Sequence, residues 1–456
     1  MMASSQPLGT IQDMPRGTRV TALKDLDFVG TYETVVLAYL VTLLFLHPYG
    51  IALNAEANLR FPDLVALVAL MAGFGGILLR GKVYVNHLFY VICGAFVVLE
   101  LVLPVLGAVG YKRPVDLVSA FRMAMFWMPM VFLTMLAPAH RALRFEQRLD
   151  SLLLVTLWLN LGYALVQIGV SLGFVPRSLV ITNLLSPWAL DQNVNIIQGL
   201  RPAGFFANST ALSAFAVVCL CFFYAKYVAW RAMRDLVCSL MAVALVVFTA
   251  SRAAFVAAIV ILLVGWLRLP VPRKMTVLSI VVAGSAALLW TIEATIGIAE
   301  TFYRFQRLLE SGLLEDQSFA ARFYHIWPAA IDAARDYTVG TLIQAPRALP
   351  LIDSGYLNYY LQGKWVFVVA LAAMLAGLWF VGIRAFVGGR GQRIGVMSLF
   401  LAIYLTGGLI ISNPLRSPLV VFFIVFALWR VRSEQSAISI VPPAVAQGRV
   451  PGTGDA

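Results

Sequence analysis

Thr249-Ala-Ser-Arg-Ala253 lies in the middle of an apolar run, residues 236–267, in which Arg252 is the one charged residue. A single helix over this run would be about 48 Å long, whereas the hydrocarbon core of a bilayer is about 30 Å thick. The loops on both sides of the run are basic, which predicts that both face the cytoplasm and that the chain crosses an even number of times between them. We therefore predict two short helices that turn at Ser251 and Arg252, with Arg252 at the outer boundary.

The composition is that of a membrane protein. Hydrophobic residues make up 61% of the chain, charged residues only 12%, and the mean hydropathy is +0.86. Such a chain cannot cover a water-facing surface with polar groups. Long uncharged runs favour helices over a β-barrel. The basic residues fall in short loops between apolar runs, so the net charge of +12 indicates membrane topology and not nucleic-acid binding.

Apolar runs and charged loops together predict an all-α polytopic membrane protein with about twelve transmembrane helices and both termini in the cytoplasm. The runs lie near 33–51, 61–79, 84–109, 117–137, 151–173, 203–224, 236–267, 275–298, 364–383, 395–412 and 418–431. The predicted organisation is a cytoplasmic tail at 1–30, membrane helices at 31–298, an outer (periplasmic) loop at 299–363, membrane helices at 364–432 and a disordered cytoplasmic tail at 433–456.

The outer loop is expected to be helical. Glu300 and Arg304 stand four residues apart among apolar positions that suit an amphipathic helix, and a second such helix is predicted at about 318–336. Pro328 would be tolerated within this second helix or would split it. The four cysteines lie inside apolar runs without a Cys-x-x-Cys pair, so we expect neither a disulfide nor a metal site from Cys93, Cys219, Cys221 and Cys238.

A second arginine stands at the edge of an apolar run, in Leu200-Arg-Pro-Ala-Gly-Phe-Phe-Ala-Asn208. The number of crossings between the basic, cytoplasmic loops predicts that Arg201 lies at the same outer face as Arg252. An arginine costs about 2.5–3.5 kcal/mol near the membrane centre and less near the interface, so two retained arginines suggest an anionic partner. The guanidinium fork matches pairs of phosphate oxygens. The alternative is that both side chains snorkel to lipid headgroups. Gly204 permits close backbone approach, and Asn208 adds a hydrogen-bonding group.

Three motifs in this order resemble the superfamily of O-antigen polymerases and ligases, which are membrane glycosyltransferases of the GT-C class. They are Arg201-Pro-Ala-Gly204 followed by Asn208, the hairpin with Thr249-Ala-Ser-Arg252, and the loop end Asp353-Ser-Gly-Tyr-Leu-Asn-Tyr-Tyr-Leu-Gln362. The resemblance implies a GT-C-like fold in a bacterial inner membrane. It also implies glycan transfer on the outer face without metal or cofactor. The implied partners are donor and acceptor saccharides on undecaprenyl pyrophosphate, membrane lipids, a chain-length regulator and a flippase.

By the same resemblance, Arg201 and Arg252 would hold the pyrophosphate and stabilise the charge that grows on it. Arg322 would contact these phosphates or the acceptor glycan; the alternative is a surface salt bridge with Asp316 or Asp336. Further substrate contacts are expected from Gly204, Asn208, Ser251, Tyr356 and Arg416. For Arg416 the alternative is a headgroup contact.

The acceptor hydroxyl has to lose a proton, and Asp353 is the first candidate base. Its alternative role is that of a turn-forming residue before Ser354 and Gly355. His325, expected to share a helix face with Arg322, is the second candidate base, and its alternative role is packing among aromatic residues. Lys364 stands where the superfamily usually has glycine, one residue after Gly363, so the motif does not fix the geometry at the end of the loop.

Ligases of this superfamily carry a histidine at the position of Asp353, so the sequence favours a polymerase. The alternative within the family is a ligase that transfers the glycan to lipid A core or to protein. The alternative of another class is a lipid-linked oligosaccharide flippase, but such transporters are expected to show related halves and charges along a central cavity. Neither feature is found in the sequence.

Overall fold

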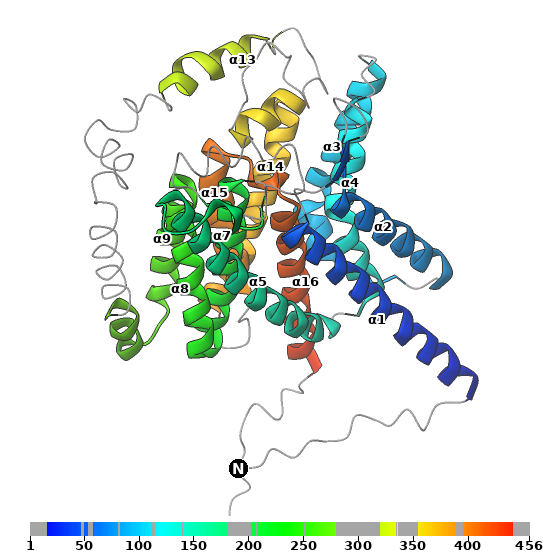
Figure 1. Ribbon diagram of the computed structural model, residues 1–456. Coiled ribbons are helices and arrows are strands. Elements are labelled where there is room, and N and C mark those ends of the chain that lie inside the picture. Colours follow the sequence, from blue (N-terminus) through cyan, green and yellow to red (C-terminus); the bar gives the residue numbers. More distant parts are fainter. Residues whose placement is uncertain are drawn as a thin grey trace, which may run out of the picture.

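Apolar helices account for most of the computed structural model of this chain (Figure 1). The structure describes residues 16–46, 50–52, 58–80, 83–110, 115–138, 140–179, 202–206, 208–249, 251–279, 320–333, 335, 354–388 and 395–440. Within these residues, six helices are long and apolar enough to cross a membrane, and three shorter apolar helices accompany them. The chain is therefore a helical, membrane-embedded protein by the length and composition of its helices.

The described elements follow the predicted apolar runs. In chain order they are α1 (Arg16–Phe45), β1 (Gly50–Ala52), β2 (Asn58–Arg60), α2 (Phe61–Arg80), α3 (His87–Gly110), α4 (Val115–Leu136), α5 (Arg141–Ser171), η2 (Arg177–Leu179), α7 (Ser209–Trp230), α8 (Met233–Phe248), α9 (Arg252–Leu267), η4 (Arg322–Ile326), α13 (Trp327–Ala333), α14 (Gly355–Val387), α15 (Gly395–Ile411), η5 (Pro414–Arg416) and α16 (Pro418–Ile440). The antiparallel pair β1–β2, with Gly50 opposite Arg60, adds a short sheet between α1 and α2.

The predicted division of 236–267 into two helices is confirmed. α8 ends at Phe248 and α9 begins at Arg252, so the turn lies where the single charge interrupts the run. Each helix has 16 residues and is therefore about 24 Å long, shorter than the bilayer core. On α9 the buried residues recur at helical spacing, and this face packs against α7 and α15; they are Ala254, Ala257, Ala258, Ile261 and Gly265. The small side chains permit close helix contact.

α7 forms the centre of the bundle. Every residue from Leu212 to Tyr227 is buried, so the helix is covered on all sides, as expected for a helix that is apolar around its whole circumference. α15 and α16 pack against it and are buried over most of their lengths. α1, α2 and α3 instead expose apolar side chains such as Met71, Leu79 and Val91. In Figure 1, α1 and α2 lie to one side of this centre.

Helices extend into both predicted tails. α1 begins at Arg16, so residues 16–30 are helical and continuous with the first apolar run. α16 continues to Ile440, so residues 433–440, predicted as disordered, are also helical. Both extensions are polar. The hydrophobic pattern predicts a helix only where apolar residues recur, so it does not predict the helical turns beyond the apolar part. Residues 1–15 and 441–456 lie outside the described part.

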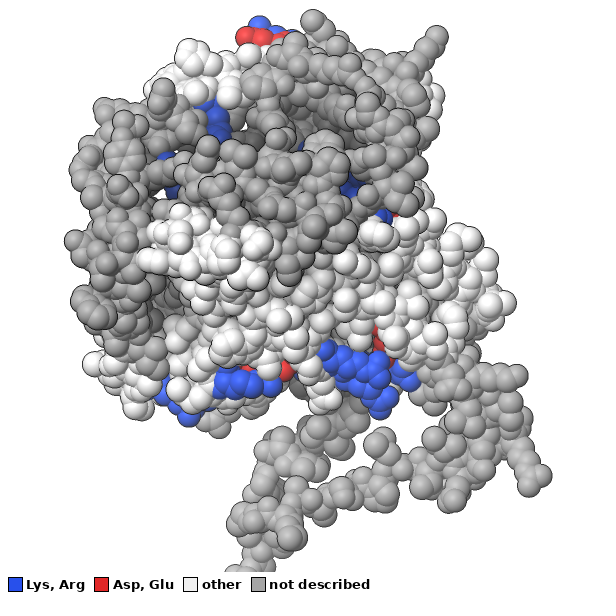
Figure 2. Space-filling view, viewed as in Figure 1, with Lys and Arg blue, Asp and Glu red and all other residues white. Residues whose placement is uncertain are grey.

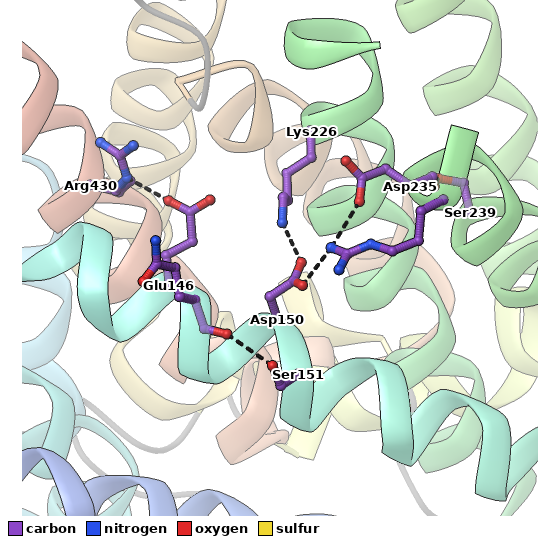
Figure 3. A network of polar contacts seen from close by, with 9 residues as sticks. Glu146, Asp150, Ser151, Lys226, Asp235, Ser239 and Arg430 are labelled. Atoms are coloured by element: carbon purple, nitrogen blue, oxygen red, sulfur yellow. Dashed lines mark hydrogen bonds and ion pairs between the residues drawn. The ribbon is translucent and has the colours of Figure 1, made fainter. Parts of the chain in front are cut away.

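Charged side chains join the helices at one end of the bundle, which we call the basic end (Figures 2 and 3). Asp150 of α5 pairs with Lys226 at the end of α7 and with Arg234 at the start of α8. Glu146, one turn earlier on α5, pairs with Arg430 of α16 at 2.7 Å. At the same end, Arg268 after α9 donates hydrogen bonds to the last carbonyls of α14. The opposite end, where α7, α9 and α14 begin, is called the site end below.

The pair of Glu146 and Arg430 provides a stability prediction. Both side chains are almost completely buried. Arg430→Met alone leaves a buried carboxylate without its counter-ion and should cost about 3–5 kcal/mol, whereas Glu146→Leu with Arg430→Met should be close to neutral. Thermal unfolding in detergent should therefore give a lower midpoint for the single variant than for the double variant. A double variant well below the wild type would instead show that the pair itself contributes net stability.

Candidate functional site

The loop that follows Arg201 is attached to α5 at the site end. Gln167 accepts hydrogen bonds through its Oε1 from the backbone N–H groups of Ala203 (3.0 Å) and Gly204 (2.9 Å), and its Nε2 donates to the carbonyl of Gly204 (3.3 Å). Asn160, two turns earlier on α5, accepts from Phe205 N at 3.0 Å. Both amide side chains are 0% exposed. Because buried backbone groups need partners, these bonds fix the loop.

Gly204 is required for this attachment. Its φ is +58°, in the left-handed region, and a Cβ at this position would overlap the Oδ1 of Asn160. Phe205 then stacks on Tyr163 of α5, with ring centroids 4.7 Å apart, and meets Phe45 of α1 edge-on. The sequence predicted close backbone approach at Gly204. In the structure the group approached is the side chain of Asn160.

Asn208 begins α7. Its Oδ1 accepts a hydrogen bond from Ala211 N at 2.8 Å, which is the usual bond of an N-cap residue. The side chain predicted to contact substrate thus has a structural role at the first turn of the central helix. Arg201 lies outside the described residues, and Pro202 is the first described residue of the loop.

Arg252 is the first residue of α9, and Ser251 is the N-cap residue before it. The hydroxyl of Ser251 makes no capping hydrogen bond, although its carbonyl accepts from Phe255 N at 2.9 Å. Both side chains are half-buried. α9 packs against α7 and runs in the same direction, so its first residue lies at the same end of the bundle as the loop before α7. Arg252 and the segment attached to α5 are therefore brought to one end of the molecule.

The end of the predicted outer loop is docked on α15. Ser354 caps α14 by accepting from Leu357 N, and its hydroxyl donates to Leu409 O. The N–H of Gly355 donates to Ser412 O at 2.9 Å. Asp353 lies outside the described residues and directly precedes this fixed point.

Tyr356, another predicted substrate contact, uses its hydroxyl to donate to Thr406 O of α15 at 3.1 Å. The structure therefore gives Tyr356 a role in holding the start of α14.

α14 is broken after two turns. Gly363 has φ −141° and Lys364 has φ +52°, so the segment Gly355–Gln362 is a separate short helix before the longer part. A Cβ on Gly363 would lie close to Leu103 and Phe367. The kink lies at Lys364, whose ammonium is 5.5 Å from the ring centre of Tyr360. A non-glycine residue at such a φ is uncommon and costs conformational energy.

Arg416 contacts the short helix. Its Nη2 donates to the Oδ1 of Asn358 at 3.0 Å, and the same oxygen accepts from Gln362 at 2.8 Å. The guanidinium is nevertheless exposed. Arg416, predicted from its place in the sequence alone, thus lies beside the first turns of α14.

Arg322 and His325 lie in a π-helical turn, η4. The N–H of Trp327 bonds to the carbonyl of Arg322, five residues back. Pro328 follows and has no N–H, so the wider turn accommodates it and the helix continues into α13 without a break. The α-helical spacing assumed for a shared face therefore does not apply. His325 is exposed and Arg322 is half-buried.

The helix α13 packs on α14 at the site end, where Ala330 meets Leu361. In Figure 1, α13 lies beyond the start of α14, on the side away from the basic end. The second predicted amphipathic helix is therefore present, over the described residues 320–333. The first, near 299–310, lies outside the described part.

Sequence reasoning missed Asn160, Gln167 and Glu100. Each was visible as a polar residue inside an apolar run: the two amides seven residues apart in 151–173, and Glu100 as the one Asp, Glu, Lys or Arg of 84–109. A polar side chain at such a place suggests a specific partner. The partner itself depends on which helices pack together.

The site end combines the arginines Arg252 and Arg416 with a loop held by buried amides, and guanidinium groups can bind anions. In the part of the chain described by the structure, no three His, Cys, Asp or Glu side chains are grouped so as to hold a metal ion. No protein-family model matches the chain. No curated protein matches it either.

Proposed function

We propose that the protein is a membrane glycosyltransferase of the polysaccharide polymerase type, acting on saccharide repeat units linked to undecaprenyl pyrophosphate. In this proposal the chain crosses a bacterial inner membrane about twelve times, with both termini in the cytoplasm and the site end at the periplasmic face. The observation that carries the proposal is the assembly at one end of the bundle of Ala203 and Gly204, Arg252, and Gly355 at the start of α14.

The proposed reaction joins an acceptor hydroxyl to C1 of the donor sugar. The bond between C1 and the pyrophosphate oxygen breaks, and its electron pair leaves with the pyrophosphate lipid. Arg201 and Arg252 would neutralise this growing charge, which is where fixed guanidinium groups near an apolar medium are most effective. The hydroxyl proton passes to a base, for which Asp353 is the first candidate. The arrangement supports a role for the exposed Arg416 beside the donor or acceptor saccharide.

The test is reconstitution of the purified protein in vesicles with repeat units linked to undecaprenyl pyrophosphate. We expect a ladder of longer glycans and release of one pyrophosphate lipid for each bond formed. Transfer to lipid A core or to protein, without a ladder, would indicate a ligase. Movement of the lipid-linked saccharide across the bilayer without a new glycosidic bond would indicate a transporter and would contradict the proposal.

The same assay separates the two candidate bases. His325 is exposed on η4, so His325→Ala should leave turnover within about twofold of wild type, as expected for a surface side chain. Asp353→Asn should reduce turnover more than this, because the amide cannot accept the proton. If His325→Ala gives the larger loss, the histidine is the base and Asp353 serves the turn before Ser354.

A further inference from the structure

Glu100 is a carboxylate inside the helix bundle. It lies on α3, is 4% exposed, and receives two hydrogen bonds: from Trp127 Nε1 of α4 at 2.7 Å and from the hydroxyl of Tyr359 of α14 at 3.1 Å. Burial of a carboxylate is costly unless its oxygens are hydrogen-bonded, and here each oxygen has a donor. Glu100 therefore joins three helices that are far apart in the sequence.

Tyr359 carries this connection into the site end. Its ring packs edge-on against Phe96 of α3 and Phe367 of α14, with centroids 5.2 Å and 4.8 Å away. Its hydroxyl also lies 3.4 Å from the Oδ1 of Asn413, which precedes η5. The next residue toward the N-terminus, Asn358, is the one that holds Arg416. A single buried tyrosine thus connects Glu100 with the helical turn whose Asn358 side chain binds Arg416.

Because of the kink at Gly363 and Lys364, these contacts determine the position of the short helix Gly355–Gln362. Because the short helix Gly355–Gln362 does not continue the axis of the rest of α14, the longer part cannot fix its orientation. Its first turn is held on α15 through Ser354, Gly355 and Tyr356. Its second turn is held on α3 through Tyr359 and Glu100.

We propose that Glu100 is a positioning residue for the reaction site: through Tyr359 it fixes the short helix whose start follows Asp353 and whose Asn358 orients Arg416. This inference rests on the proposed function for its catalytic consequence. Glu100 does not contact substrate in this role. It acts by holding the start of the short helix and Arg416 in register, and small displacements of groups at a reaction site can cost large factors in rate.

The variants are Tyr359→Phe, which removes only the hydroxyl, and Glu100→Gln, which leaves one acceptor oxygen for two donors. Both should lower kcat for polymerisation about tenfold or more while KM for the lipid-linked unit stays within about twofold. The matched control is Glu146→Gln, a buried carboxylate at the basic end whose partner is Arg430. It should lower thermal stability but leave kcat per folded molecule unchanged.

Hydrogen exchange of the peptide that covers Gly355–Gln362 is measured on the same proteins. Faster exchange there in Tyr359→Phe and Glu100→Gln, but not in Glu146→Gln, is expected. If wild type polymerises and the two variants keep its kcat, the inference is wrong whatever the exchange shows. If wild type forms no polymer, the proposed function fails, and hydrogen exchange alone tests the positioning role. Unchanged exchange of the short helix in the two variants would overturn that role. Faster exchange would support it.

Discussion

Arg252→Ala is expected to lower polymerisation by about 100-fold or more without loss of protein from the membrane. Removal of one preorganised group that stabilises transition-state charge typically costs about 10²–10³ in kcat, and the proposed leaving group is a pyrophosphate. Arg201→Ala should show a loss of the same order. Arg252→Lys keeps the charge without the planar fork and should give an intermediate rate. Initial rates of pyrophosphate-lipid release from vesicles measure all three.

The matched control lies on the same helix. Arg268 follows the last residue of α9 at the basic end and donates to the carbonyls of Ala385 (2.8 Å) and Gly388 (2.6 Å). Arg268→Ala removes these bonds to the end of α14 and should lower the thermal midpoint, because hydrogen bonds from charged groups stabilise by about 1.5–3 kcal/mol. Its rate per folded molecule should stay within about threefold of wild type. If Arg252→Ala behaves like Arg268→Ala, the assignment of Arg252 to pyrophosphate is wrong.

The position of Arg252 is a case in which sequence alone was sufficient. Neither helix propensity nor hydrophobicity divides 236–267, because both halves are uniformly apolar. The division followed from the thickness of a bilayer and the charges of two loops, which together constrain the number of crossings. The structure has the break at the predicted residues, with α9 beginning at Arg252.

The partners of the loop residues could not be predicted in this way. Gly204 and Asn208 were selected as substrate contacts, and their observed contacts are with Asn160 and with Ala211 N. Tertiary packing decides which helix lies beside the loop. The hydrophobic periodicity of 203–224 does not predict that helix. The same holds for Glu100, whose two donors come from α4 and α14.

Local backbone chemistry explains two further differences. The π turn at Arg322 directly precedes Trp327 and Pro328. The sequence offered only a tolerated or a split helix at Pro328, and not a wider turn before it. The kink at Gly363 and Lys364 lies at the start of the predicted apolar run 364–383, which located the longer part of α14 but not the short helix before it. A left-handed lysine has no sequence signature, since lysine rarely adopts this conformation.

Gln167→Leu is expected to reduce polymerisation about 100-fold although residue 167 is not assigned to substrate. The substitution puts an apolar side chain of similar size on α5 and removes the partners of three backbone groups in the loop after Arg201. Each buried group left unpaired costs about 1–3 kcal/mol, so the loop should leave its place on α5 to find other partners. Arg201, two residues before Ala203, would move with it. A displacement of about 1 Å in a positioning group can cost 10²-fold in rate.

Gly204→Ala reaches the same loop by a different route, because its Cβ would overlap Asn160 Oδ1 and its φ of +58° disfavours alanine. A comparable loss of rate is expected. Thr156→Val is the control on α5: its buried hydroxyl donates within the helix to Leu152 O, and its removal leaves the loop contacts in place. Agreement between Gln167→Leu and Gly204→Ala, with Thr156→Val near wild type, would attribute the loss to the loop. Wild-type rates in both loop variants would mean that catalysis does not depend on how α5 holds Arg201, and the proposed pyrophosphate site would then lose its structural basis.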